Sequence, residues 1–183
     1  MSKIYLTSDC HFGHKNIIAY ENRPFTDLVS MREQMILNHN ALVSPEDTCI
    51  NLGDFIMGNK EQAQAILSRM NGRKILIRGN HDGHSIQWYL DAGFDEVWPG
   101  TIIEHDGLKI FLSHCPEARP GDGAHYDLHF YGHVHGKTGH RGIYETTTRD
   151  GACLCVERWN YKPVDIDTVI AMCKAAPTTS GAI

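Results

Sequence analysis

The sequence predicts an α/β fold in which a parallel sheet covered by helices packs on a second, mainly antiparallel sheet. Short apolar runs rich in β-branched residues recur along the first half, and helix-like patterns separate them. The second half carries an Asp-Gly hairpin signal between strand-like segments. With 183 residues, the chain is expected to form a single domain over residues 1–174, followed by a flexible tail over 175–183.

The first half alternates strands with helices. Short, β-rich runs bounded by turn residues predict buried strands at Ile4–Ser8, Thr48–Leu52 and Lys74–Arg78. Apolar residues at helical spacing predict helices between them, at Leu28–Val43 and Lys60–Met70. Because a helix follows each of the first two strands, we expect neighbouring parallel strands with the helices packed outside.

The second half has the pattern of a β-sheet built from hairpins. The segments Thr101–His105 and Leu108–Ser113 flank Asp106-Gly107, which predicts a tight hairpin with a type I′ turn. Further strand-like segments follow at Leu128–Tyr131 and Ala152–Val156. We therefore expect a mainly antiparallel sheet packed on the first one.

The composition is typical of a soluble globular protein, with 42% hydrophobic and 21% charged residues. No apolar stretch reaches the roughly 18 residues that a membrane-spanning helix needs, and the first residues show no secretory signal. We therefore expect a cytoplasmic protein without a membrane partner. The formal net charge of −5 argues against charge-driven binding of nucleic acid, so no stable nucleic-acid complex is expected.

Histidine and cysteine usage favours metal chemistry of a particular kind. The chain has 12 histidines, and histidine binds transition metals and moves protons near neutral pH. Its 6 cysteines include no Cys-x-x-Cys pair, which argues against a zinc ribbon or a thioredoxin-like motif. We expect reduced thiols, with Cys153 and Cys155 on the same face of a strand.

Side chains of the types that bind metals follow five of the predicted strands, at the point where each strand ends. They are Asp9, His11, Asp54, Asn80, His114, His133 and His135. Because ligands bind at the carboxyl ends of strands in open α/β sheets, we expect these side chains to meet at one edge. Oxygen and imidazole donors without thiolate suit Mn, Fe or Zn in an open site, and the set is large enough for two ions.

The order of these motifs closely resembles that of the calcineurin-like metallophosphoesterases. The motifs are Ser8-Asp9-Cys10-His11, Gly53-Asp54, Gly79-Asn80-His81-Asp82, Ser113-His114 and Gly132-His133-Val134-His135. Asp9–His14 and Asn22-Arg23-Pro24-Phe25 bring the chain close to the small single-domain members of bacteria and their phages. The resemblance implies a four-layer α/β/β/α sandwich of two mixed sheets flanked by helices, with a dinuclear metal centre on one rim.

The resemblance also implies a role for each motif residue. Asp9, His11 and His135 would hold the first ion, Asn80, His114 and His133 the second, and Asp54 would bridge both. His81 would contact the phosphate and protonate the leaving oxygen, while Asp82 would orient or tune His81. Two divalent ions are the expected cofactors, with Mn favoured and Fe, Zn or Ni as alternatives.

Three further residues are candidates for binding the substrate, because they follow the first metal motif. His14, Asn16 and Arg23 would line the pocket; alternatively, Asn16 starts a helix and Arg23 ties down a loop. We expect the other histidines outside the motifs to be surface or structural residues, namely His39, His105, His125, His129 and His140.

Each motif alone has other interpretations, and the ordered set excludes most of them. A His-x-His pair also occurs in metallo-β-lactamase-type sites, but here His135 is followed by Gly136-Lys137 rather than by further ligands. An amidohydrolase barrel needs about 250 residues. A Gly-Asp or Gly-Asn-His-Asp string alone is often a plain turn or a helix cap.

The expected function is hydrolysis of a phosphomonoester or phosphodiester by a hydroxide that bridges two metal ions. The chain shows no added capping or nucleic-acid-binding domain, which favours a small phosphorylated substrate such as a nucleotide or cyclic nucleotide. One alternative is a nuclease that acts on single-stranded DNA or RNA. A second is a metal-dependent scaffold without activity, although a scaffold has no need of His81.

Overall fold

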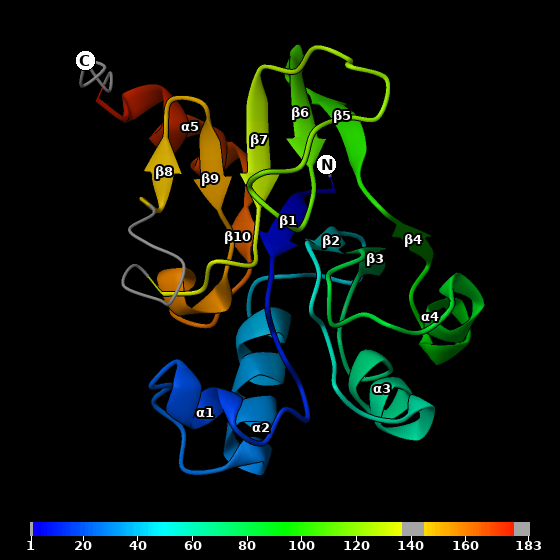
Figure 1. Ribbon diagram of the computed structural model, residues 1–183. Coiled ribbons are helices and arrows are strands. Elements are labelled where there is room, and N and C mark those ends of the chain that lie inside the picture. The colour runs from blue at the N-terminus through cyan, green and yellow to red at the C-terminus, as the bar shows by residue number, and fades with distance from the viewer. Residues whose placement is uncertain (1, 137–144, 178–183) are drawn as a thin grey trace.

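The computed structural model describes residues 2–136 and 145–177, and its strands form two five-stranded sheets (Figure 1). The first sheet has the order β10-β1-β2-β3-β4. Its strands are β1 (Ile4–Thr7), β2 (Thr48–Asn51), β3 (Arg73–Ile77), β4 (Glu96–Trp98) and β10 (Val164–Asp165). The strands β1 to β4 are parallel as predicted, whereas β10 pairs antiparallel with β1.

Helices cover the outer face of the first sheet, in the lower part of Figure 1. They are α1 (Ile17–Tyr20), α2 (Leu28–Asn40), α3 (Lys60–Leu67) and α4 (Ile86–Ala92). Capping boxes at Asp27 and Asn59 start α2 and α3, because each side chain accepts a hydrogen bond from a backbone N–H of the first turn. Both predicted helices are therefore present, each about one turn shorter at its C-terminal end.

The second sheet has the order β5-β6-β7-β9-β8. Its strands are β5 (Thr101–His105), β6 (Leu108–Leu112), β7 (Leu128–Tyr131), β8 (Thr147–Thr148) and β9 (Gly151–Cys153). The hairpin is confirmed, and φ angles of 50° at Asp106 and 75° at Gly107 fit its type I′ turn. The sheet was expected to be mainly antiparallel, which was wrong for its three central strands, because β6, β7 and β9 run parallel. The long connection 113–127 returns the chain to the start of β6 without a helical pattern.

A large hydrophobic cluster lies between the two sheets. Leu6 and Ile50 of the first sheet, and Ile110 and Phe130 of the second, are buried in one cluster with Val169 of α5 (Ile166–Ala175). Burying a side chain of this kind stabilises the fold by about 1.5–3 kcal/mol. The fold class is confirmed as two mixed sheets flanked by helices, and Cys153 and Cys155 share a buried cluster at the end of the second sheet.

The parallel strands of both sheets bring their carboxyl ends to one rim. Figure 1 shows the arrowheads of β6 and β7 pointing toward the end of β1. Within residues 2–136 and 145–177, no helix has the length and apolar character of a membrane span. The division at residue 174 stays a prediction: α5 extends to Ala175, and residues 178–183 of the predicted tail lie outside the described residues.

Candidate metal centre

The rim brings together all the side chains that the sequence identified as metal ligands. Asp9 and His11 follow β1, Asp54 follows β2, and Asn80 follows β3 in the first sheet. His114 follows β6, and His133 and His135 follow β7 in the second sheet. The site therefore lies where the two sheets meet, and each sheet supplies part of it.

Asp9, His11 and His135 form one cluster, which we call the first group. The Nε2 atom of His11 lies 3.8 Å from Asp9 Oδ1, and the Nε2 atom of His135 lies 3.5 Å from the same oxygen. Their ligand atoms lie within 4.8 Å of one another, as one ion requires. Asp9 and His11 are almost fully buried, with exposed fractions of 0% and 2%.

Asn80, His114 and His133 form a second cluster, which we call the second group. His114 Nε2 lies 2.9 Å from Asn80 Oδ1 and 3.1 Å from His133 Nδ1. The other ring nitrogen of His114, Nδ1, lies 2.8 Å from the carbonyl oxygen of Leu52. That contact makes Nδ1 the protonated nitrogen of a neutral ring, so Nε2 is the atom available to an ion.

Asp54 lies between the two groups. Its Oδ2 atom is 3.5 Å from His11 Nε2 and 3.3 Å from His114 Nε2. Its other oxygen, Oδ1, accepts a hydrogen bond of 2.8 Å from the backbone N–H of His81. The carboxylate thus has one oxygen fixed by the backbone and one facing both groups, which is the placement that a bridging ligand needs.

Five of the expected ligands have left-handed backbone conformations. The φ angles are 58° at Asp9, 50° at His11, 55° at Asp54, 71° at His133 and 50° at His135. Non-glycine residues rarely adopt this region, and each such residue costs about 1–3 kcal/mol. The fold supports this strain at the rim, because each left-handed residue turns its side chain from the strand direction into the centre.

Two glycines keep the backbone close to the central carboxylates. A Cβ atom on Gly79 would overlap Asp54 Oδ1, and one on Gly132 would overlap Ser8 Oγ and Asp9 Oδ2. The need for glycine at these positions is therefore close approach. Gly53 differs, because its φ of 106° also requires a residue without a side chain.

The polar atoms of the first group indicate that the site fits a metal ion. Asp9 Oδ1 and both ring nitrogens of His11 are buried and have no hydrogen-bond partner among the described residues. An unpaired buried polar atom costs about 1–3 kcal/mol, and an ion would remove that cost for each atom facing it. Carboxylate, amide and imidazole donors are the ligands that Mn, Fe and Zn accept.

The protonation of these groups also suits metal binding. Burial lowers the pKa of His11 to about 4, so its ring is neutral and can bind an ion. Burial opposes ionisation of Asp54, but the hydrogen bond and charge of His114 outweigh it and lower the pKa of Asp54 to about 2. In return, Asp54 raises the pKa of His114 to about 9 against the effect of burial. An ion must therefore displace a proton from His114.

His81 and Asp82, the two predicted catalytic residues, lie in different surroundings. His81 is exposed, and its ring centroid is 5.4 Å from that of His11, beside the first group. Asp82 is buried, and its carboxylate accepts hydrogen bonds from the backbone N–H groups of Gly79, Asp54 and Phe55, at 2.8, 2.7 and 3.2 Å. Asp82 thus fixes the backbone around Asp54, which differs from the predicted contact with the His81 side chain.

The substrate-binding prediction for Arg23 was wrong. Its side chain is 0% exposed, and the guanidinium donates hydrogen bonds to the carbonyl oxygens of Asp9 and Cys10, at 2.7 and 2.8 Å. The alternative interpretation, that Arg23 ties down a loop, describes what the structure shows. A buried arginine that carries these contacts has no donor facing the open rim.

His14 and Asn16 lie near the first group at the surface. The His14 ring is 5.5 Å from the His11 ring, and its Nδ1 accepts a hydrogen bond from the Asn16 backbone N–H. The Asn16 side-chain amide lies 3.4 Å from the Tyr20 hydroxyl. Asn16 directly precedes α1, but its side chain forms no capping hydrogen bond with the helix. Binding of substrate by these two residues stays a prediction.

Two residues to which the sequence assigned no role at the site support the first group. The Sγ of Cys155 lies 3.2 Å from Asp9 Oδ2, and Glu157 Oε1 lies 3.2 Å from His135 Nδ1. Both come from the segment after β9, where the start of the 3-10 helix η1 (Val156–Trp159) carries no metal-ligand spacing. No sequence signal identified them as part of the site, because they are far from its motifs in the sequence and approach it only in the folded structure.

The remaining histidines are placed as expected where the structure describes them. His39 is buried and contacts the Asn71 carbonyl, His105 pairs with Asp167, and His125 lies at the surface. His129 is buried beneath the second group, 2.7 Å from Ser113 Oγ. His140 lies outside the described residues.

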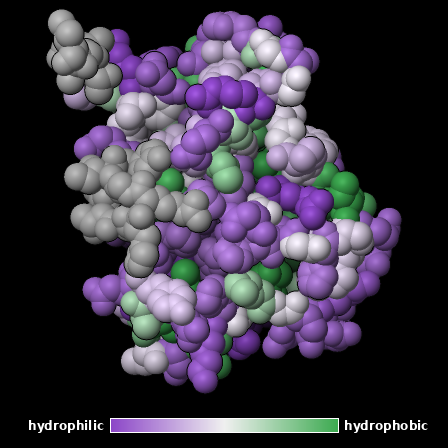
Figure 2. All heavy atoms as spheres, viewed as in Figure 1, coloured by the Kyte–Doolittle hydropathy of each residue, from purple (hydrophilic) through white to green (hydrophobic). Residues whose placement is uncertain are grey.

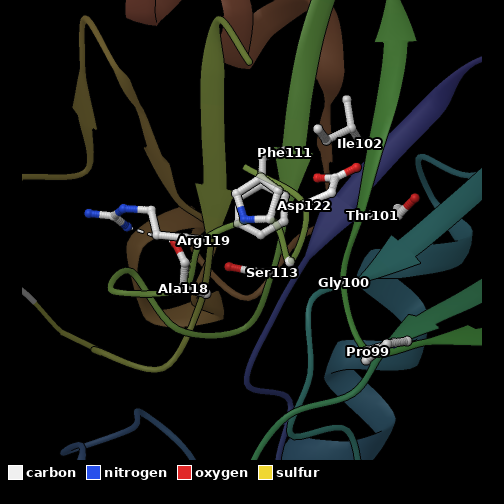
Figure 3. Close-up of a pocket in the computed structure, with 11 residues that line it drawn as sticks. Pro99, Gly100, Thr101, Ile102, Phe111, Ser113, Ala118, Arg119 and Asp122 are labelled. Atoms are coloured by element: carbon white, nitrogen blue, oxygen red, sulfur yellow. Dashed lines mark hydrogen bonds between the residues drawn. The ribbon is translucent and has the colours of Figure 1, made fainter. Parts of the chain in front are cut away.

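A cavity of about 440 Å³ lies on the outer face of the second sheet, next to the strand end that carries His114 (Figure 3). Phe111 of β6 and Ser113, which follows the strand, form one wall, and Ala118–Asp122 form another. Figure 3 shows Arg119 extending away from the Phe111 ring, with its Nη1 2.6 Å from the Ala118 carbonyl oxygen. Space-filling atoms show a largely hydrophilic surface over this face (Figure 2).

The chain is similar to proteins that carry no stated function. It is 36% identical over 179 residues to the uncharacterized protein MJ1445 of Methanocaldococcus jannaschii, covering 94% of this chain and 92% of the relative. The crystal structure of protein AQ665 from Aquifex aeolicus, described as of unknown function, matches with a TM-score of 0.73 and 29% identity. That match covers 94% of this chain and 100% of the other.

A weaker likeness is to a structure described as a novel archaeal phosphodiesterase. Its TM-score is 0.48 at 21% identity, over 84% of this chain and 82% of that chain. No family model matches the sequence.

Proposed function

We propose that this chain, which belongs to one family with protein MJ1445, is a calcineurin-like metallophosphoesterase that hydrolyses a phosphoester of a small substrate. The observation that carries the proposal is the first group with its neighbour Asp54. Asp9 Oδ1 and both ring nitrogens of His11 are buried there without a hydrogen-bond partner among the described residues, and His135 reaches the same place from the end of another strand.

The residues of the rim fit two divalent ions, with Mn favoured. The first group would hold one ion and the second group the other, with Asp54 between them. Bound there, two ions would supply Lewis-acid stabilisation of a phosphoryl group and a water made acidic at neutral pH.

The side chains of this protein would then position the substrate and move a proton. His81 stands exposed beside the first group, where its imidazole can donate a proton to the leaving oxygen. The Asp82 carboxylate accepts hydrogen bonds from the backbone N–H groups of Asp54 and Gly79, and so fixes the position of the His81 segment relative to Asp54. His14 lies at the edge of the same surface and is our candidate for contact with the substrate.

A cavity near the strand end that carries His114 has room for a small substrate, and none of the expected metal ligands lines it. The cavity of about 440 Å³ beside Ser113 falls within the range of roughly 300–1,000 Å³ typical of small-molecule sites. We propose a nucleotide or cyclic nucleotide, no stable complex with nucleic acid or membrane, and action in the cytoplasm, where the free cysteines stay reduced.

The test is a comparison of substrates with metal-free and Mn²⁺-loaded protein. We expect Mn²⁺-dependent hydrolysis of bis-p-nitrophenyl phosphate and of nucleotides or cyclic nucleotides, and little cleavage of single-stranded DNA. Preferential cleavage of single-stranded DNA would favour a nuclease. A sample with two equivalents of metal and no turnover on any phosphoester would favour a scaffold and contradict the proposal.

A further inference from the structure

A buried ion pair lies directly behind the first group. The Nε and Nη2 atoms of Arg23 donate hydrogen bonds to Glu157 Oε1, at 2.9 and 2.6 Å. Their side chains are 0% and 7% exposed, and 134 residues separate them in the sequence. The pair joins the segment after α1 to the helix η1, and each partner reaches a different part of the first group.

Arg23 fixes the backbone of the first group. While Nε and Nη2 bind Glu157, Nη2 also donates to the Asp9 carbonyl oxygen and Nη1 to the Cys10 carbonyl oxygen. These carbonyls belong to the stretch that turns left-handed at Asp9 and again at His11. The guanidinium therefore stabilises the strained backbone that presents Asp9 and His11 to the centre.

Glu157 contacts the third member of the first group. Its Oε1 atom lies 3.2 Å from His135 Nδ1, and the opposite ring nitrogen, Nε2, lies 3.5 Å from Asp9 Oδ1. A carboxylate that accepts a hydrogen bond from Nδ1–H fixes the ring orientation and leaves Nε2 with a free lone pair. The contact thus points the imidazole at the position between Asp9 and His11.

Stability alone gives a poor account of this ion pair. Removing two charges from water costs several kcal/mol per ion, and buried pairs often contribute no net stability compared with apolar residues. The pair also leaves Glu157 Oε2 buried and without a hydrogen-bond partner among the described residues. Its placement, with Arg23 on the Asp9 backbone and Glu157 on the His135 ring, matches the requirements of an ion in the first group.

We propose that Glu157 is a positioning residue that orients His135 toward an ion in the first group, while Arg23 holds both Glu157 and the Asp9 backbone. This inference rests on the proposed function, because it assumes that the first group binds a metal ion. Glu157 itself does not touch the ion or the substrate in this arrangement.

The test measures Mn²⁺ affinity by calorimetry in the full-length protein, for the wild type, Glu157→Gln, His135→Ala and the double variant. Glu157→Gln keeps the size of the side chain and removes its charge. Loss of an outer-shell partner typically costs about 10- to 100-fold in metal affinity, and we expect that loss in the tighter of two binding steps. Glu33→Gln is the matched control, because Glu33 also pairs with an arginine, Arg69, but on an exposed surface.

The double variant separates positioning from general stabilisation. If Glu157 acts through His135, the Glu157→Gln change in the His135→Ala background alters Mn²⁺ affinity by less than about threefold. A full additional loss in that background would overturn the inference and assign Glu157 a structural role.

Glu157→Asp keeps the inference testable if Glu157→Gln does not fold. It retains the charge that Arg23 needs but shortens the reach toward His135, so weaker Mn²⁺ binding with an unchanged melting temperature is expected. Nitrogen-15 spectra of the His135 ring in the metal-free protein should shift in both variants and not in Glu33→Gln.

The outcomes separate this inference from the proposed function. If the wild type binds two ions and hydrolyses phosphoesters but both Glu157 variants bind Mn²⁺ like the wild type, only the inference is overturned. If the wild type binds no Mn²⁺, the inference and the proposed function both fail.

Discussion

The two groups of the metal centre differ in how their ligand atoms are satisfied. In the first group, Asp9 Oδ1 faces the imidazoles of His11 and His135 at 3.8 and 3.5 Å, too far for hydrogen bonds. In the second group, His114 Nε2 lies within hydrogen-bond distance of both Asn80 and His133, at 2.9 and 3.1 Å. The expected ligands of the first group thus form no hydrogen bonds with one another, whereas those of the second group do.

The difference follows from what lies behind each group. The first group is buried and held from outside by Arg23, Glu157 and Cys155, so its ligand atoms keep their places without bonding to one another. In the second group, Asn80 is exposed and His133 is half-buried. The first group therefore offers a preorganised position, whereas the second offers one whose internal hydrogen bonds must be exchanged for an ion.

The largest effect should come from the residue that the two groups share. Asp54→Ala removes the carboxylate that faces His11 and His114, so we expect both metal positions to be lost together with turnover. Elemental analysis of the purified variant measures this directly. Two full metal equivalents in Asp54→Ala would show that the groups are independent, and the bridging role of Asp54 would then be wrong.

His81→Ala should leave both groups intact and remove most of the turnover. General acid catalysis contributes about 10²- to 10⁴-fold, and we expect a loss of that size with an alkyl phosphoester. The loss should be smaller with p-nitrophenol, which leaves without help from a proton. An unchanged rate on the alkyl ester, with metal content as in the wild type, would contradict the proton-donor role.

Gly132→Ala should damage the first group selectively. The added Cβ would overlap Asp9 Oδ2 and Ser8 Oγ, and overpacking of this kind costs about 1–3 kcal/mol. We expect a lower free energy of unfolding in urea and a weakened tighter Mn²⁺ step. Gly121→Ala is the control, since a Cβ there meets nothing within 4 Å; equal behaviour of the two variants would argue against the close approach.

Metal titration compares the groups directly. Each contains one histidine whose pKa is raised to about 9 by a neighbouring carboxylate against the effect of burial, His135 or His114. Release of a proton on Mn²⁺ binding is therefore expected at both groups and does not distinguish them. The Mn²⁺ affinity of both groups should rise with pH up to about 9. The second group must also give up two hydrogen bonds worth about 0.5–1.5 kcal/mol each, so its step should be about tenfold weaker or more.

Calorimetry with Mn²⁺ at constant pH resolves the two steps. His135→Ala should weaken the tighter step and leave the weaker one nearly unchanged. Loss of the weaker step in that variant would reverse the order of the two groups.

The smallest effect concerns the support beneath the second group. Burial lowers the pKa of His129, which contacts Ser113 next to His114, to about 4. The unfolded chain takes up this proton near pH 6.5, so stability is full above that pH and falls as pH drops toward 4. Between pH 7 and 5.5 we expect a loss of about 1 kcal/mol that His129→Gln does not show. Urea unfolding of both proteins at the two pH values checks this. An equal change in the free energy of unfolding in the wild type and in His129→Gln would contradict it.

The sequence predicts the ligands of both groups and not the difference between them. Asp9, Asp54 and His114 are recognisable because each follows an apolar strand, and parallel strands end at one edge. The parallel pairing of β6 with β7 escaped prediction, because the connection 113–127 shows no helical pattern. Adjacent strand-like segments of this kind favour an antiparallel interpretation.

The support of the first group could not be predicted from the sequence. Arg23 belongs to a recognisable Asn-Arg-Pro-Phe motif, but spacing does not tell whether a guanidinium faces substrate or backbone carbonyls. Glu157 lies 134 residues away, and no local pattern connects the two. Left-handed φ angles at Asp9 and His11 are likewise invisible, since neither residue is a glycine that would mark the turn.

The pairing of the two ends of the chain has a consequence for biosynthesis. Strand β1 pairs with β10, and Arg23, near the beginning, holds Glu157. A growing polypeptide thus carries Asp9 and His11 well before it carries Glu157, which lies 134 residues after Arg23. A nascent chain that has not yet reached Glu157 therefore cannot have the finished arrangement of the first group.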